Sequence, residues 1–249
     1  MTKRFIAIGC CCLASLLLLF GTAMSLDYET VTQKWSKTQN FAEEGNALEL
    51  TATLFSPEYV NAVSLKEAEK NLWTKDEVEQ YKYSILKVSR MDEYIPIEMS
   101  FNIIGSPLHT APFDRHVELW INGKSYKAAE YDPRLNFKIE DSRNGMVYFP
   151  RYDEDGNDLL ENANQIKLRV KPAISHALKG NTAEFVWSVD DMQGSLLEQL
   201  EGEAARKFEY DRLLKRLKNL NQKKEDIRDE MEKVETEIAT IENRLSELK

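Results

Sequence analysis

Residues 227–248 read IRDEMEKVETEIATIENRLSEL, and this stretch sets the organisation of the C-terminal part of the chain. Apolar residues recur there at alternating steps of four and three, the spacing that is typical of coiled-coil helices. The pattern extends back to Tyr210 and is broken only at Lys224. Because residues 195–249 contain no proline and a single glycine, we predict one long coiled-coil helix there. Its interaction seam comprises Leu213, Leu217, Leu220, Ile227, Met231, Val234, Ile238, Ile241, Leu245 and Leu248.

The charges that flank this seam indicate how two such helices would pair. In a parallel in-register homodimer the facing residues carry like charges, at Lys223–Arg228, Glu230–Glu235, Glu237–Glu242 and Arg244–Lys249. In an antiparallel pair opposite charges face each other, at Lys223–Glu230 and Arg216–Glu237. The sequence therefore favours an antiparallel homo-oligomer, or pairing with another helical envelope protein. The alternative is a single amphipathic helix lying on the chain's own sheets, but a seam about 58 Å long exceeds what such a domain covers.

Residues 1–25, MTKRFIAIGCCCLASLLLLFGTAMS, have the order of a secretory signal peptide. A basic start precedes a long apolar run, and small residues follow at Ala23 and Ser25. Two alternatives stay open: an uncleaved membrane anchor, because about 20 apolar residues can span a bilayer, and a lipoprotein processed at Cys10. All three cysteines lie within this segment, at positions 10–12. We therefore expect export to the periplasm or the extracellular space, with membrane attachment only if the segment is retained.

Residues 27–190 are expected to form a β-rich domain with two inserted helices. Asn46–Phe55 alternates apolar and polar residues, the pattern of a half-buried strand. Ser56-Pro57 then supplies an N-cap and a first-turn proline, which predicts a helix at about 57–70. The stretch TKDE, residues 74–77, reads as a capping box that opens a second helix at about 75–88.

Short strands separated by turn signals follow these helices. Asn122-Gly123 lies between two alternating runs and predicts a tight hairpin, and Asn144-Gly145 predicts a second, longer turn. Pro96 lacks a backbone donor, so its strand is expected at a sheet edge or Pro96 at a strand start. Further strands are expected at Ile166–Val170 and Ala183–Val189. The fold class predicted for the chain is mainly β with inserted helices, an immunoglobulin-like sandwich, plus the C-terminal coiled coil.

Chemistry-bearing motifs are sparse in this sequence. It contains no GxSxG, HExxH or GxGxxG motif, so we predict no catalytic residue and no cofactor. The stretch HTAPFDRHVE offers possible metal ligands at His109, Asp114, His116 and Glu118, and the competing interpretation is a loop entering a strand. A net charge of −9 gives no electrostatic reason to bind nucleic acid.

The stretch DEDGND resembles a calcium-binding loop, because oxygen ligands alternate at Asp153, Asp155 and Asn157, with Glu161 nearby. The glycine stands fourth in this stretch, whereas an EF-hand loop has it sixth, so a solvated Asp-Gly turn is the favoured interpretation. Trp120 points opposite to the apolar face of its own strand, and we expect it on an exposed contact surface.

The order of ALELTATLFSPEY, then helices, then strands ending in AEFVWSV resembles uncharacterised exported β-sandwich proteins of bacteria. The resemblance covers about residues 46–189 and implies a fold without implying an activity. From the residues we predict a non-catalytic exported binding or scaffold protein of the envelope that assembles through its coiled coil. The alternatives are a metal-dependent protein or enzyme using residues 109–118, and a membrane-anchored structural protein.

Overall fold

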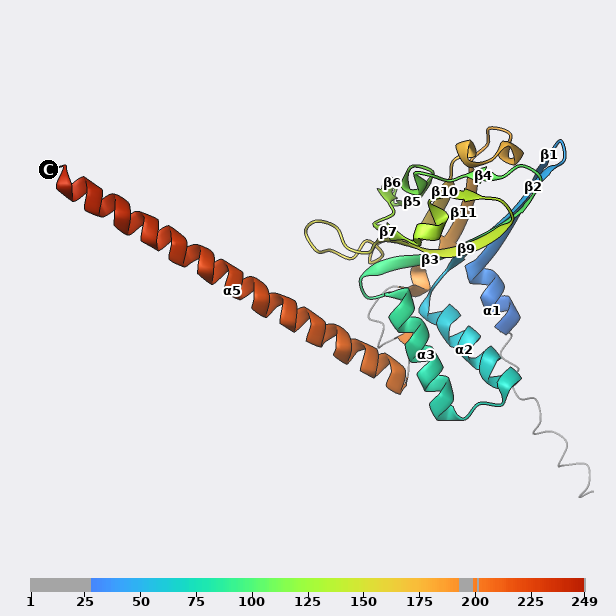
Figure 1. Cartoon of the computed structure of the whole chain (residues 1–249). Helices are drawn as coiled ribbons and strands as arrows, with labels where there is room; N and C mark the ends of the chain where they lie inside the picture. The colour runs from blue at the N-terminus through green and yellow to red at the C-terminus, as the bar shows by residue number, and fades with distance from the viewer. Residues whose placement is uncertain (1–27, 193–198, 201, 249) are drawn as a thin grey trace, which may run out of the picture.

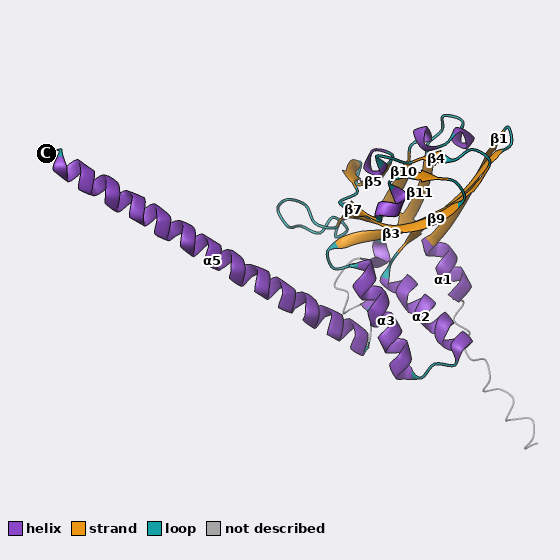
Figure 2. Ribbon diagram, viewed as in Figure 1, coloured by secondary structure: helices purple, strands orange, loops and turns teal. Residues whose placement is uncertain are grey.

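The structure, a computed structural model, describes residues 28–192, 199–200 and 202–248 (Figure 1). The predicted signal segment, residues 1–25, lies outside the described residues. Within them the chain combines antiparallel sheets with helices and ends in one long helix, α5, which spans Glu203–Glu247 (Figure 2). Because α5 alone has 45 residues, the chain as a whole is mixed α/β and not mainly β.

Two antiparallel sheets contain most of the strands. The larger sheet has the order β1-β2-β3-β9-β7, the smaller sheet has the order β11-β10-β5-β6, and β4 pairs with β8. The strands are β1 Ser36–Glu43, β2 Asn46–Leu54, β3 Tyr94–Ile104, β4 Leu108–His109, β5 Val117–Ile121, β6 Lys124–Lys127, β7 Glu130–Tyr131, β8 Lys138–Ile139, β9 Ser142–Pro150, β10 Gln165–Val170 and β11 Ala183–Ser188.

Alternate residues of these strands point into one shared core. Leu50 and Met99 of the larger sheet and Leu119, Leu168 and Phe185 of the smaller sheet belong to the same buried cluster. Each fully buried large apolar side chain contributes about 1.5–3 kcal/mol relative to exposure. The alternating pattern therefore predicted the inward faces, whereas the immunoglobulin-like assignment stays a prediction.

Helices α2 and α3 begin at the capping residues that the sequence indicated. Ser56 Oγ accepts a hydrogen bond from the Tyr59 N–H at 3.0 Å. Thr74 and Glu77 form the predicted capping box, in which the Thr74 N–H donates to Glu77 Oε2 at 2.7 Å. These bonds satisfy amide groups that the first turn of a helix leaves without partners. The shorter helices are α1 Tyr28–Trp35, α2 Pro57–Asn71, α3 Lys75–Ser89 and the 3-10 turns η1 Phe113–Arg115, η2 Pro133–Leu135, η3 Pro172–Ile174, η4 His176–Leu178 and η5 Asp190–Met192.

The two Asn-Gly pairs have different roles. Asn122 and Gly123 both have positive φ, 49° and 79°, and join β5 to β6 as the predicted tight hairpin. The turn predicted at Asn144-Gly145 is wrong, because Gly145 lies inside β9 opposite Met99 of β3. A Cβ added at Gly145 would lie 2.8 Å from the Asp132 Cβ, so this glycine permits a close approach between segments.

The sequence predicted that Pro96 lies either in an edge strand or at a strand start, and the structure excludes the edge strand. Pro96 is the third residue of β3, which lies between β2 and β9, so the edge-strand alternative is wrong. β2 ends at Leu54, which pairs with Ile97, so Pro96 lies just beyond that pairing. A proline near the start of a strand removes a ladder bond where the ladder is already ending.

A second buried cluster joins the helices to one another. It contains Val60 of α2, Leu86 of α3, and Ala205 and Phe208 of α5. Beyond this contact α5 extends away from the sheets and the other helices (Figure 1). Among the described residues, no helix combines the length and the apolar character that crossing a membrane requires.

Candidate functional site

The predicted seam of α5 is uncovered in the single chain. We use the name α5 seam for the ten apolar residues defined above, from Leu213 to Leu248. Their exposed fractions lie between 48% at Ile227 and 71% at Leu248. Apolar side chains of this size are usually buried in soluble proteins, and an extended exposed row of them marks an interaction surface. No described residue of the chain covers this row.

The opposite face of α5 packs against the remainder of the protein. With Tyr210 counted as heptad position a, the buried residues Ala204, Ala205 and Phe208 occupy positions b, c and f. The polar contacts continue on this face at Asp211 and Lys215, again b and f positions. Positions b, c and f lie opposite the a and d positions of a helix. We call residues 28–192 the body of the protein. The α5 seam faces away from this body, which argues against a helix that lies on its own sheets.

Charged and polar side chains fix this packing. The Tyr83 hydroxyl of α3 donates to Asp211 Oδ2 at 2.5 Å, and this bond raises the pKa of Tyr83. Lys215 Nζ lies 2.5 Å from Glu93 Oε1, and this bond lowers the pKa of Glu93. Both contacts join α5 to α3 or to the segment that follows it, so they hold the first turns of α5 in one orientation.

The start of α5 is held by a side chain from another helix. Its N-cap residue, Gly202, supplies no side-chain cap, and Glu79 Oε2 of α3 accepts from the Ala204 N–H at 2.8 Å. Glu79 also pairs with Lys82, a buried residue, at 3.2 Å. Partial burial raises the pKa of Glu79, but the bonds from Ala204 and Lys82 outweigh it and the net pKa is lowered. Gly202 has a φ of 121°, a backbone conformation that favours glycine, and a Cβ there would also lie 2.5 Å from this carboxylate.

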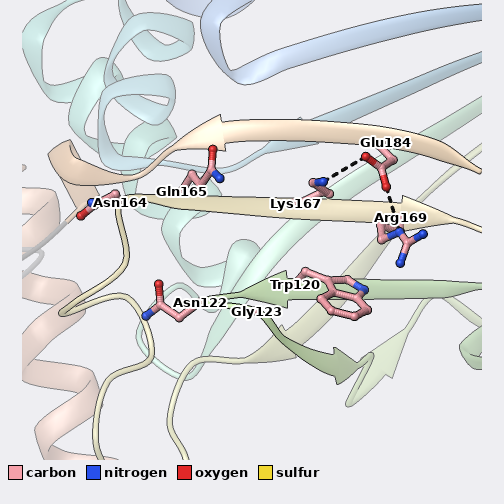
Figure 3. A pocket seen from close by; sticks show the side chains of 8 residues that line it. All are labelled: Trp120, Asn122, Gly123, Asn164, Gln165, Lys167, Arg169 and Glu184. Atoms are coloured by element: carbon pink, nitrogen blue, oxygen red, sulfur yellow. Dashed lines mark ion pairs between the residues drawn. The ribbon is translucent and has the colours of Figure 1, made fainter.

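A second candidate surface is a groove of about 670 Å³ on the smaller sheet, which we call the sheet groove (Figure 3). Its lining includes Trp120, Lys167, Arg169 and Glu184 from β5, β10 and β11. Glu184 lies 3.0 Å from both Lys167 and Arg169, and the Lys167 bond is the main cause of its lowered pKa. The Arg169 guanidinium lies 5.2 Å from the centre of the Trp120 ring. The groove is thus a polar surface with one aromatic ring.

The remaining lining of the sheet groove consists of amide side chains and a glycine, namely Asn122, Gly123, Asn164 and Gln165. Trp120 is partly exposed, and its Nε1–H is buried without a hydrogen-bond partner in the described part of the chain. A buried donor of this kind is uncommon, and indoles at binding surfaces usually donate to a partner. An aromatic ring beside amide groups suits a polar ligand or a polar protein surface.

The first set of predicted metal ligands does not form a cluster. His109 lies in β4, Asp114 in η1, and His116 immediately before β5. Glu118 lies in β5 and pairs with Arg169 at 3.8 Å and Lys171 at 3.6 Å. Partial burial lowers the pKa of His116. Across the described residues, no three His, Cys, Asp or Glu side chains are placed to hold one metal ion.

The predicted calcium-like loop uses its acidic groups internally. Asp153 Oδ1 accepts from the backbone N–H of Asp155 at 3.0 Å and of Asn157 at 2.8 Å. Asp153 Oδ2 accepts from the Asn157 side chain at 3.0 Å, and the Asn157 bonds lower the pKa of Asp153. This arrangement is a turn in which an aspartate bonds its own backbone.

Sequence reasoning missed the residues that dock α5 and the charged part of the sheet groove. Glu79 and Tyr83 belong to an ordinary polar helix in the sequence, and only the packing of α3 against α5 gives them partners. Lys167, Arg169 and Glu184 alternate with core residues in their strands, which was the one available signal that they share an outer face.

Comparisons with known proteins identify no family. No family model matches the chain, and no curated protein matches it. One solved structure, a protein of unknown function from Burkholderia pseudomallei K96243, is similar over 70% of this chain and 88% of its own. Its sequence is 10% identical and the TM-score is 0.37, so the likeness is too low to support a conclusion about fold or function.

Proposed function

We propose that this chain is a non-catalytic scaffold or binding protein of the bacterial envelope, in which α5 joins the sheet-bearing body to another helix. The observation that carries the proposal is the α5 seam, whose ten apolar residues are exposed while the opposite face packs on α3. If each side chain buries its exposed half, the row supplies roughly 1 kcal/mol per residue. That sum is ample to drive pairing of two helices.

Export is the second part of the proposal. It is supported by residues 1–25, whose basic, apolar and small-residue segments follow in the order of a signal peptide. The location that follows is the periplasm or the extracellular space, and retention of the segment would make the protein membrane-anchored. The mass of the mature protein, measured after expression of the full gene, distinguishes cleavage after Ala23 or Ser25 from retention.

The body presents contacts in this proposal. The two sheets around one core are taken as an immunoglobulin-like sandwich, and the sheet groove is its contact surface. Support comes from Trp120, whose partly exposed ring borders the groove. A polar partner could pack on this ring and bond to the amide groups beside it.

The assembly is tested by sedimentation equilibrium of the mature protein. We compare it with Met231→Lys, which sets a charge in the middle of the α5 seam, and with Asp229→Lys on the solvent side of the same helix. We expect the mature protein to associate. Met231→Lys should abolish this association, and Asp229→Lys should preserve it. A monomer at all concentrations, together with no helical partner after crosslinking in intact envelopes, would overturn it.

A further inference from the structure

We infer that the helix that covers the α5 seam is α5 of a second copy, paired antiparallel along its whole length. The centre of the pair lies between residues 225 and 226, so a and d residues that are equally distant from this point form the apolar layers. This inference rests on the proposed function, because it names the partner that α5 takes.

The apolar layers match in this register. Leu217 faces Val234 of the second copy, Leu220 faces Met231, and Leu213 faces Ile238. The layer beyond these joins Tyr210 to Ile241, and the central layers join Lys224 to Ile227. Alternating a and d positions meet in this way in antiparallel coiled coils. The long stem of Lys224 covers apolar surface while its ammonium group reaches solvent.

The facing g positions carry opposite charges in this register. The three pairs of facing g positions are Glu209 with Arg244, Arg216 with Glu237, and Lys223 with Glu230. Each pair occurs twice in a symmetric dimer, and the e positions add Lys207 with Glu242. Exposed ion pairs are individually weak, so the apolar layers drive pairing while the charges select the register and the direction.

The length of the helix agrees with the same register. Glu203 begins α5 and faces Leu248, which follows the last helical residue. Each helix therefore ends level with the start of its partner. The end layers are the weakest, because Leu245 faces Arg206 and Leu248 faces a glutamate. Since the body docks on the b, c and f face, it leaves the a and d face open for the second copy over this whole length.

A shift of one heptad toward the C-terminus is the strongest competing register. It centres the pair on residue 229 and gives Leu245 and Leu248 apolar partners. It also sets Arg216 against Arg244, and it brings Glu230 and Arg228 each against its own equivalent in the second copy. The competing register thus has better apolar ends but more repulsive than attractive flanking pairs, which makes the two registers distinguishable by charge exchange.

The test measures the dimer dissociation constant of the mature protein and three variants by sedimentation equilibrium at low salt. In the inferred register, Arg216→Glu and Glu237→Arg each replace two attractive pairs with two repulsive pairs. Each variant alone is expected to weaken association by on the order of tenfold. The double variant Arg216→Glu/Glu237→Arg restores opposite charges and is expected to return to the original value. Raised salt reduces all these differences because it screens exposed charges.

The other arrangements predict that one of these variants lowers the dissociation constant instead of raising it. In the shifted register Arg216→Glu strengthens association, because Arg216 there faces Arg244. In a parallel in-register dimer Glu237→Arg strengthens association, because Glu237 there faces Glu242. Either result overturns the inference and leaves the proposed assembly through α5 standing, as does a monomeric protein that binds only a foreign helix. A chain that finds no helical partner of any kind overturns both.

Discussion

The substitution Ile238→Ala tests how much the α5 seam contributes to association. Ile238 is 50% exposed in the single chain and occupies an a position near the middle of the C-terminal half of α5. Burying the exposed half of an isoleucine side chain is worth roughly 1 kcal/mol, about half of the value for full burial. A symmetric dimer contains the residue twice, so the variant loses about 2 kcal/mol per dimer. The dissociation constant should then rise roughly 30-fold.

The matched control is Asn243→Ala, an exposed f position on the same helix. Alanine favours the helical state at either position, so neither variant is expected to weaken the helix itself. Sedimentation equilibrium gives the dissociation constants, and near-ultraviolet circular dichroism reports the folding of the body, which neither variant should change. Equal dissociation constants for the two variants would refute the reasoning, as would a loss of body structure in Ile238→Ala.

Three further predictions concern other parts of the molecule. Lys224→Leu removes the only polar residue within the seam and should lower the dissociation constant about tenfold or more in sedimentation equilibrium; no tightening would contradict it. Trp187→Phe should destabilise the body by about 2–4 kcal/mol in urea unfolding, because the buried Trp187 Nε1–H donates to the Trp35 carbonyl at 2.8 Å, whereas Trp120→Phe should change stability by less than about 1 kcal/mol. Because the pKa of Glu79 is lowered, its bond to the start of α5 stabilises the docked helix above the ordinary glutamate value of 4.5 and loses that contribution as the pH falls through the lowered value; hydrogen exchange at Ala204 should show this pH dependence, and Glu79→Gln should remove it.

Local signals in the sequence predicted much of the secondary structure. Ser56 and Thr74 marked the starts of α2 and α3, and Asn122-Gly123 marked a hairpin, because capping and tight turns depend on neighbouring residues alone. β1 was missed, since its polar residues lack a clear apolar alternation and it pairs at a sheet edge. Gly145 was misread, because a glycine that permits a close tertiary approach looks the same in sequence as a glycine in a turn.

The same distinction between local signals and tertiary packing applies to the candidate site. The apolar period revealed the α5 seam because a helix repeats its faces at a fixed spacing. The docking face was not predictable, since Ala204, Ala205 and Phe208 acquire their meaning only from the position of α3. Likewise, the sheet groove forms because β5, β10 and β11 are neighbours in one sheet. The alternation of apolar and polar residues does not predict this strand order.

The most direct test of the central claim is a pair of spin-label distances within the dimer. Labels are placed at Asp229 or at Asn243, both f positions, in a chain whose three native cysteines are replaced by serine. In the inferred register the two labels at Asp229 are offset along the helix axis by about 10 Å, and those at Asn243 by about 52 Å. Pulsed electron paramagnetic resonance should therefore give a much longer distance at Asn243 than at Asp229. Equal distances at the two positions would mean parallel helices and would contradict the account.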